Sequence, residues 1–237
     1  MDNKEKLGIS SKELVVIKPI TDNQKEAFKS YEANKNLFLY GVAGTGKTFI
    51  ALYLALKNAL DTKSPQKKVY IVRSLLPTGD TGFFPGDEQD KAYLYQVPYK
   101  NMVRFMFKRP SDEDFNRLYT DLQKQSTIEF LSTSFLRGIT IDDGIIIVDE
   151  CQNLNFHELD TIMTRIGQNT RIIFAGDVQQ TDLIKTNDRN GILNFVSIMQ
   201  AMKDVDCIEF DLNDIVRSGL IKSYLIDKIK LGLHYDG

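Results

Sequence analysis

The chain has 237 residues, and its 30 basic and 32 acidic side chains give a formal net charge of −2. This length suits one large domain with a sizeable core, and the balanced charge provides no global argument for nucleic-acid binding. The two cysteines, Cys151 and Cys207, predict no disulfide framework and fit a reducing, cytoplasmic setting. The polar start of the chain lacks a signal peptide's apolar core, and no apolar run is long enough for a membrane span, so no membrane partner is expected.

Short apolar runs alternate with helix-forming segments along most of the chain. Strands are predicted at 37–40, 69–72, 128–131, 145–148, 171–175 and 207–210, with a further edge strand at 14–17. Helices are predicted at 23–33, 49–60, 112–124, 155–167, 191–202 and 218–231, and another is predicted to begin at Tyr99, after Pro98. Continuous apolar strands separated by helices are typical of an α/β fold, with a mainly parallel sheet and helices on both faces.

The strongest motif is a glycine-rich loop between the strand at 37–40 and the helix at 49–60. It matches the pattern G-x-x-x-x-G-K-[ST], in which backbone N–H groups surround phosphates and the lysine reaches toward the outer phosphates. A turn that only connects a strand to a helix is the alternative, but the strand before it and the helix after it favour a nucleoside triphosphate site. The predicted binding residues are Gly41, Val42, Ala43, Gly44, Thr45, Gly46, Lys47 and Thr48.

A second motif, Asp149-Glu150, ends the apolar strand at 145–148. Ligands of open α/β folds lie at the carboxyl ends of the strands, so Asp149 is predicted to hold Mg²⁺ together with the Thr48 hydroxyl. Glu150 is predicted to polarise the attacking water. An acidic pair after a strand is by itself more typical of a capped helix start, but the phosphate loop about 100 residues earlier favours the nucleotide role.

Two further segments are less specific. Gly176-Asp177 also follows a predicted strand, where a polar side chain could sense the terminal phosphate, although the pair is equally ordinary turn chemistry. From Arg73 to Lys91 the periodicity disappears, and prolines and glycines mark a long loop. Loops of this length in a compact domain are usually functional or mobile.

Taken together and in this order, the motifs resemble those of the PhoH-like ATPases, phosphate-loop NTPases related to superfamily 1 helicases. The resemblance implies a single RecA-like domain at 14–237 with an insertion at about 74–126, preceded by a polar tail at 1–13. The motifs that carry the resemblance are Thr21-Asp22-Asn23-Gln24, the phosphate loop, Gly82-Phe83-Phe84-Pro85-Gly86-Asp87, Asp149-Glu150-Cys151-Gln152-Asn153, Gly176-Asp177-Val178-Gln179-Gln180 and Asp214-Ile215-Val216-Arg217.

The resemblance also assigns roles to residues that would otherwise pass for ordinary surface positions. It implies that Gln24 contacts the adenine of ATP and that Gln180 links the terminal phosphate to the nucleic-acid side. Arg217 is implied to stabilise charge in the transition state, either within its subunit or across a ring interface. The chain departs from the family after Arg73, where a proline is usual, and at Cys151, where an alanine is usual.

Residues 91–109 provide a local case for nucleic acid, because they combine basic side chains with interleaved aromatic ones and contain no acidic residue. Basic groups that follow a backbone, with aromatic groups that stack on bases, are how proteins hold single strands. The alternative is a helix with one core face and one solvated basic face. The predicted nucleic-acid contacts are Arg73, Lys91, Lys100, Arg104 and Lys108.

The predicted function is Mg²⁺-dependent ATP hydrolysis coupled to binding or movement on single-stranded RNA or DNA, as in an RNA helicase or translocase. One RecA-like domain cannot form a nucleotide cleft between two domains, so a homo-oligomeric ring such as a hexamer is expected. The alternative is a ring-forming assembly switch that acts on a protein partner without strand movement. A small-molecule kinase is disfavoured, because Glu150 suits the activation of water. The predicted catalytic residues are Lys47, Glu150, Gln180 and Arg217.

Overall fold

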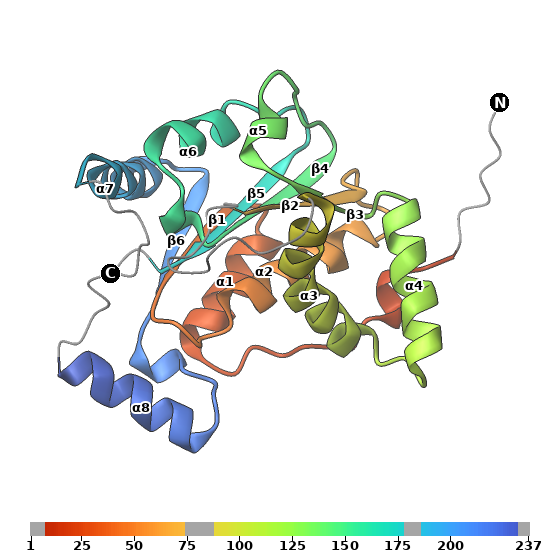
Figure 1. The fold of residues 1–237 in the computed structure, drawn as a ribbon, viewed down its shortest axis with the longest axis horizontal. Coiled ribbons are helices and arrows are strands. Elements are labelled where there is room, and N and C mark those ends of the chain that lie inside the picture. Colours follow the sequence, from red (N-terminus) through yellow and green to blue (C-terminus); the bar gives the residue numbers. More distant parts are fainter. Residues whose placement is uncertain (1–7, 74–87, 178–185, 232–237) are drawn as a thin grey trace.

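A parallel β-sheet forms the centre of the protein in the computed structural model, which describes residues 8–73, 88–177 and 186–231 (Figure 1). In this part of the chain, six strands lie in the order β3-β2-β4-β5-β1-β6, and each neighbouring pair is parallel. This arrangement confirms the predicted α/β fold. The strands are β1 (Asn36–Gly41), β2 (Lys68–Arg73), β3 (Ile128–Leu131), β4 (Gly144–Asp149), β5 (Arg171–Gly176) and β6 (Val205–Phe210).

The central strands are apolar along their whole length because both faces of the sheet are covered. Along β4, Ile145 and Ile147 belong to one core, whereas Ile146 and Val148 belong to the other. Successive side chains of a strand point to opposite faces, so a strand buried on both sides reads as an unbroken apolar run. The six predicted central strands are confirmed, each with bounds within two residues of those observed.

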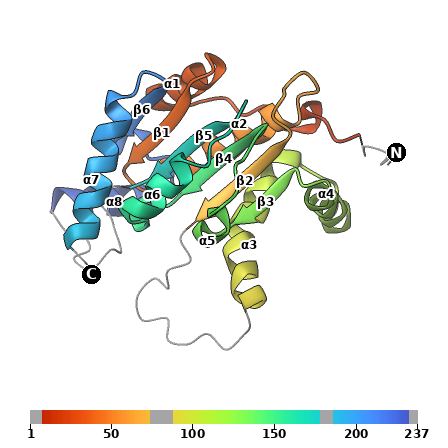
Figure 2. The ribbon, with the colours of Figure 1, turned by 90° about the horizontal axis from the view of Figure 1, so that it is seen from above.

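Helices cover both faces of the sheet (Figure 2). On one face, the sheet forms a hydrophobic core with α1 (Asp22–Glu32), α2 (Lys47–Ala59), α3 (Glu88–Phe107) and α4 (Asp112–Lys124). On the other face, the sheet forms a second hydrophobic core with α5 (Thr133–Leu136), α6 (Phe156–Met163) and α7 (Thr186–Ala201). Helix α8 (Gly219–Lys230) contains no buried residue and stands apart from both layers in Figure 1. Short 3₁₀ turns are η1 (Ser11–Glu13), η2 (Cys151–Asn153) and η3 (Leu212–Asp214).

The predicted edge strand at 14–17 is wrong. This segment is irregular, and its backbone partners come from helices: Val15 N donates to Met106 O at 2.7 Å, and Ile17 N donates to the Tyr53 hydroxyl at 3.2 Å. The apolar pattern reflects packing of Leu14 on the helical layer. Residues 8–13, assigned to the polar tail, also contact the domain, since Ser11 N donates to Leu60 O at 3.2 Å.

Three helix boundaries also differ from the prediction, one of them the start of α7, which lies at Thr186 and not at residue 191. Pro98 lies inside α3 instead of opening it, because Tyr99, Val103 and Met106 are buried in the core and their packing offsets the hydrogen bond that proline removes. Gly167 does not end α6, which stops at Met163. A Cβ atom at Gly167 would lie 2.1 Å from Asp142 Oδ1, so the glycine permits the close approach of a neighbouring loop.

No helix in the described ranges has both the length and the apolar character to cross a membrane. Helices α3 and α4 come from the predicted insertion between β2 and β3, and both pack in the same core as α1 and α2. Both helices are therefore part of the body of the domain and bring side chains to the sheet.

Candidate nucleotide-binding site

The phosphate loop connects the end of β1 to the start of α2 at the carboxyl edge of the sheet. Gly41, Gly44 and Gly46 have positive φ angles of 110°, 79° and 89°, which glycine adopts without steric cost. A Cβ atom at Gly41 would lie 2.2 Å from the carbonyl oxygen of Phe210 on β6. This backbone therefore requires glycine where the motif has it, and the loop leads into the N-terminus of a 13-residue helix, as a phosphate site needs.

Lys47 is buried at the base of this loop, with 8% of its surface exposed. Its Nζ donates to the carbonyl oxygens of Gly41 at 2.7 Å and Val42 at 2.8 Å. Burial lowers the pKa of Lys47, and the nearby carboxylates of Asp177 and Glu150 oppose that shift. The ammonium group thus lies between the loop and an acidic edge of the sheet, where it can reach phosphates bound by the loop.

Asp149 and Thr48 meet as predicted, although they are 101 residues apart. Thr48 Oγ1 donates to Asp149 Oδ1 at 2.7 Å, and the Tyr99 hydroxyl donates to Asp149 Oδ2 at 2.5 Å. Burial raises the pKa of Asp149, against the opposing effect of these hydrogen bonds and of Arg73.

The oxygen donors of this pair suit Mg²⁺. One carboxylate and one hydroxyl, completed by nucleotide phosphates and water, form the type of site that Mg²⁺ occupies in nucleotide enzymes. Among the described residues, no group of three or more His, Cys, Asp or Glu side chains could hold a metal ion by itself. The arrangement therefore fits a metal ion that arrives with a nucleotide better than an all-protein metal site.

Gln152 holds Glu150 beside the Thr48–Asp149 pair. Gln152 is part of the acidic motif, but the sequence assigned it no role. Glu150 has a left-handed backbone with φ 50°, and its Oε2 accepts a hydrogen bond from Gln152 Nε2 at 2.5 Å. Gln152 Oε1 accepts from the backbone N–H of Asp177 at 3.0 Å. A Cβ atom at Gly176 would lie 2.4 Å from Gln152 Oε1, so glycine leaves room for this bridge. Gln152 therefore joins the two acidic motifs, and its position in the motif was the only sequence signal for it.

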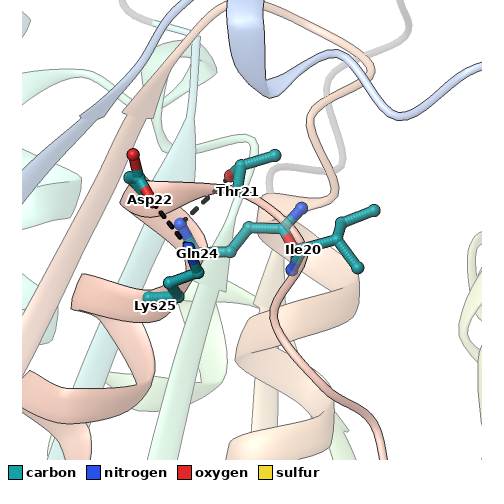
Figure 3. A network of polar contacts seen from close by, with 5 residues as sticks. All are labelled: Ile20, Thr21, Asp22, Gln24 and Lys25. Atoms are coloured by element: carbon teal, nitrogen blue, oxygen red, sulfur yellow. Dashed lines mark hydrogen bonds and ion pairs between the residues drawn. The ribbon is translucent and has the colours of Figure 1, made fainter.

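Gln24 lies against the phosphate loop at the start of α1. Its Nε2 donates to Thr45 O at 3.2 Å, and its Oε1 accepts from Ile20 N at 2.9 Å. Figure 3 shows the same helix start, where Thr21 caps the backbone N–H of Gln24 at 3.3 Å. The structure brings Gln24 to the loop, and its contact with adenine stays a prediction.

Arg217 lies on the phosphate loop of its own chain. Val216 N donates to Gly44 O at 3.2 Å, and a Cβ atom at Gly44 would lie 3.2 Å from Arg217 Cγ. The preceding turn is tied to α1, because Asn23 Nδ2 donates to Asp214 Oδ2 at 2.7 Å. Two motifs 191 residues apart thus meet at one loop, with the arginine exposed beside it.

The described side chains among the predicted nucleic-acid contacts lie in different surroundings. Arg73 pairs in register with Asp149, beside the nucleotide site, and its guanidinium lies 5.9 Å from the Tyr95 ring centroid. Two others face α4. Lys100 Nζ lies 5.5 Å from the Tyr119 ring centroid, and Arg104 forms an ion pair with Asp112. Lys108 is exposed, and the Lys91 side chain lies outside the described part.

Two aromatic side chains of the same stretch belong to the core. Tyr99 is 2% exposed and Phe107 is 4% exposed, so neither is open to a base. Phe105 is 57% exposed, although one edge of its ring packs on Phe49 with centroids 5.7 Å apart. The core-face alternative accounts for Tyr99 and Phe107, and the contacts with nucleic acid stay a prediction. Gln180 and the 82–87 motif lie outside the described residues.

This fold and this site define a phosphate-loop protein of the α/β class. The chain belongs to the PhoH-like protein family, whose model matches residues 16–227. It is 32% identical over 212 residues to a PhoH-like protein of Mycobacterium leprae (strain TN), covering 89% of this chain and 58% of that protein. It is 30% identical over 205 residues to a PhoH-like protein of Bacillus subtilis (strain 168), covering 85% of this chain and 60% of that one.

Among solved structures, the chain is similar to the large terminase of a thermophilic bacteriophage in complex with ADP. The TM-score is 0.47 and the identity 10%, over 87% of this chain and 49% of the terminase chain. The chain spans about 60% of the length of the two PhoH-like relatives named above.

Proposed function

We propose that this protein is a Mg²⁺-dependent ATPase that acts on single-stranded nucleic acid, as an RNA helicase or translocase does, in the cytoplasm. The observation that carries the proposal is the convergence of Lys47, the Thr48–Asp149 pair and Glu150 at one edge of the sheet. Membership of the PhoH-like family supports a nucleotide as the ligand. The free cysteines, Cys151 and Cys207, fit the proposed location.

Each side chain has a distinct task in the proposed reaction. Thr48 and Asp149 would hold Mg²⁺, which neutralises phosphate charge when bound. Lys47 would exchange its loop carbonyls for phosphate oxygens, and Arg217 would add positive charge from its position near Gly44. Glu150, oriented by Gln152, would accept the proton of the attacking water. Gln180 would link the terminal phosphate of ATP to the bound nucleic acid.

Nucleic acid is the proposed partner because the surface beside α3 carries the exposed Lys108 and Phe105. We expect ATP hydrolysis to rise when single strands are added, and the effect to weaken with salt as counterion release requires. An ATPase assay with a panel of single-stranded RNA and DNA measures it. Lys108→Gln should weaken the stimulation and lower the salt slope by about 1, whereas Lys63→Gln, at an exposed site in the turn between α2 and β2, should not.

If the protein hydrolyses ATP but no single-stranded RNA or DNA raises the rate, nucleic acid is not its partner. The alternative is then the assembly switch, which one observation favours. Helix α8, whose Leu225 lies near Gly44 of the phosphate loop, exposes Leu220 (85%) and Tyr224 (65%), and Leu231 directly after the helix is 71% exposed. Exposed apolar patches are typical of protein interfaces. Light scattering with and without nucleotide tests whether the chain assembles.

The position of Arg217 leads to a further prediction about any ring. Because Arg217 already lies on its own phosphate loop, we expect it to act within its subunit. Mixing inactive Arg217→Ala with inactive Lys47→Ala protein should then restore no ATPase activity. Recovery on mixing would show instead that the arginine is supplied across an interface, as one form of the ring model requires.

A further inference from the structure

Both carboxylate oxygens of Asp149 are occupied by hydroxyl donors, and the two donors come from different parts of the chain. Oδ1 accepts from Thr48, the expected metal partner. Oδ2 accepts from Tyr99, which lies 50 residues away on α3, inside the segment predicted to be an insertion. No motif or spacing in the sequence links a residue of this segment to the metal site.

The phenol of Tyr99 is held in a fixed position. The side chain is 2% exposed, and its ring packs edge-on against Phe130 of β3 with the centroids 5.4 Å apart. One and two turns further along α3, Val103 and Met106 are buried in the same core. The apolar packing alone would be satisfied by phenylalanine, so the hydroxyl is explained by its partner, Asp149.

A donor on one carboxylate oxygen fixes the rotation of the carboxylate plane. A phenol is protonated at neutral pH, so the Tyr99 hydroxyl is a hydrogen-bond donor to Asp149 Oδ2. With Oδ2 held in this way, Oδ1 is aimed at Thr48 and toward the phosphate loop. Partners that orient a metal ligand in this manner typically contribute 10–100-fold, roughly, to metal affinity.

We propose that Tyr99 is a positioning residue of the magnesium site, which orients Asp149 toward Mg²⁺ bound with the nucleotide. This inference rests on the proposed function, because it presupposes a nucleotide that brings Mg²⁺ to Asp149 and Thr48.

The test is a Mg²⁺ titration of fluorescent ADP binding, which needs no turnover. Tyr99→Phe should raise the Mg²⁺ concentration for half-maximal tight binding by about tenfold or more, and should leave ADP binding in EDTA unchanged. The matched control is Tyr53→Phe. This variant also removes the hydroxyl of a buried tyrosine. The Tyr53 hydroxyl accepts a hydrogen bond from Ile17 N at 3.2 Å and makes no contact with Asp149 or Thr48. Its Mg²⁺ midpoint should equal that of the wild type.

A second variant covers the case in which Tyr99→Phe does not fold. Phe130→Leu keeps the hydroxyl but removes the ring that holds it, and should shift the Mg²⁺ midpoint in the same direction by a smaller factor. An unshifted midpoint in whichever variant folds, judged by circular dichroism, would overturn the inference. Failure of the wild type to bind ADP at any Mg²⁺ concentration would instead overturn the proposed nucleotide function.

Discussion

Replacing Lys47 by alanine is expected to weaken nucleotide binding by about 100-fold or more and to abolish hydrolysis. Lys47 is 8% exposed, and its ammonium group lies at the base of the phosphate loop, where no other described cation occupies the same position. Hydrogen bonds to charged groups contribute about 1.5–3 kcal/mol each, and the loss of two of them toward phosphate gives this factor. Titration with a fluorescent ATP analogue measures the change.

The control for this variant is Lys57→Ala on the same helix. Lys57 is half exposed and pairs with Glu32 on the surface at 3.7 Å, so its loss should alter neither binding nor stability appreciably. Thermal unfolding separates lost binding from lost structure in Lys47→Ala, because Gly41 and Val42 lose a donor to their carbonyls. ATP binding of wild-type strength in a folded Lys47→Ala protein would refute the assignment of the loop.

Replacing Glu150 by glutamine is expected to lower the rate of hydrolysis by about 10²–10⁴-fold while ATP stays bound. The amide has the shape of the carboxylate but cannot accept the proton of the attacking water. The side chain is anchored by Gln152, not by the phosphate loop, so the loss should fall on the chemical step and not on nucleotide affinity. Single-turnover hydrolysis and equilibrium ATP binding, measured on the same protein, separate the two.

Glu129→Gln is the matched control for this loss of one carboxylate. Glu129 lies on β3 and pairs at 3.5 Å with the partly exposed Lys68, so its neutralisation should leave turnover near that of the wild type. Normal turnover in Glu150→Gln would take Glu150 out of the proposed mechanism. A large loss of ATP affinity in that variant would assign it to binding instead.

Much of the fold and of the nucleotide site follows from the sequence alone. Unbroken apolar runs such as Ile145–Val148 predict strands buried on both faces, and the structure confirms the parallel sheet. The phosphate loop is recognisable because glycine spacing and lysine position are local properties of the chain. Asp149 is recognisable because a carboxylate after a buried strand lies at the ligand edge of a parallel sheet.

Local patterns misled the interpretation where a residue's partner comes from elsewhere. The segment 14–17 has the composition of a strand but takes its hydrogen bonds from helices. Proline is typical of a helix start, but Pro98 lies inside α3 because the residues after it are packed in the core. Lys100 and Arg104 have partners on α4 that the basic pattern of the sequence does not reveal, and their contact with nucleic acid stays a prediction.

The sequence by itself determined that this chain is an α/β phosphate-loop protein of the PhoH-like family, because spacing within a motif and the order of motifs are written along the chain. Only the tertiary structure decided that Tyr99 reaches Asp149, that Gln152 joins Glu150 to Asp177, and that Arg217 lies on its own loop. These contacts join separate elements of the fold. Periodicity and local propensity carry no information on such pairs, because packing of the helices on the sheet is what brings them together.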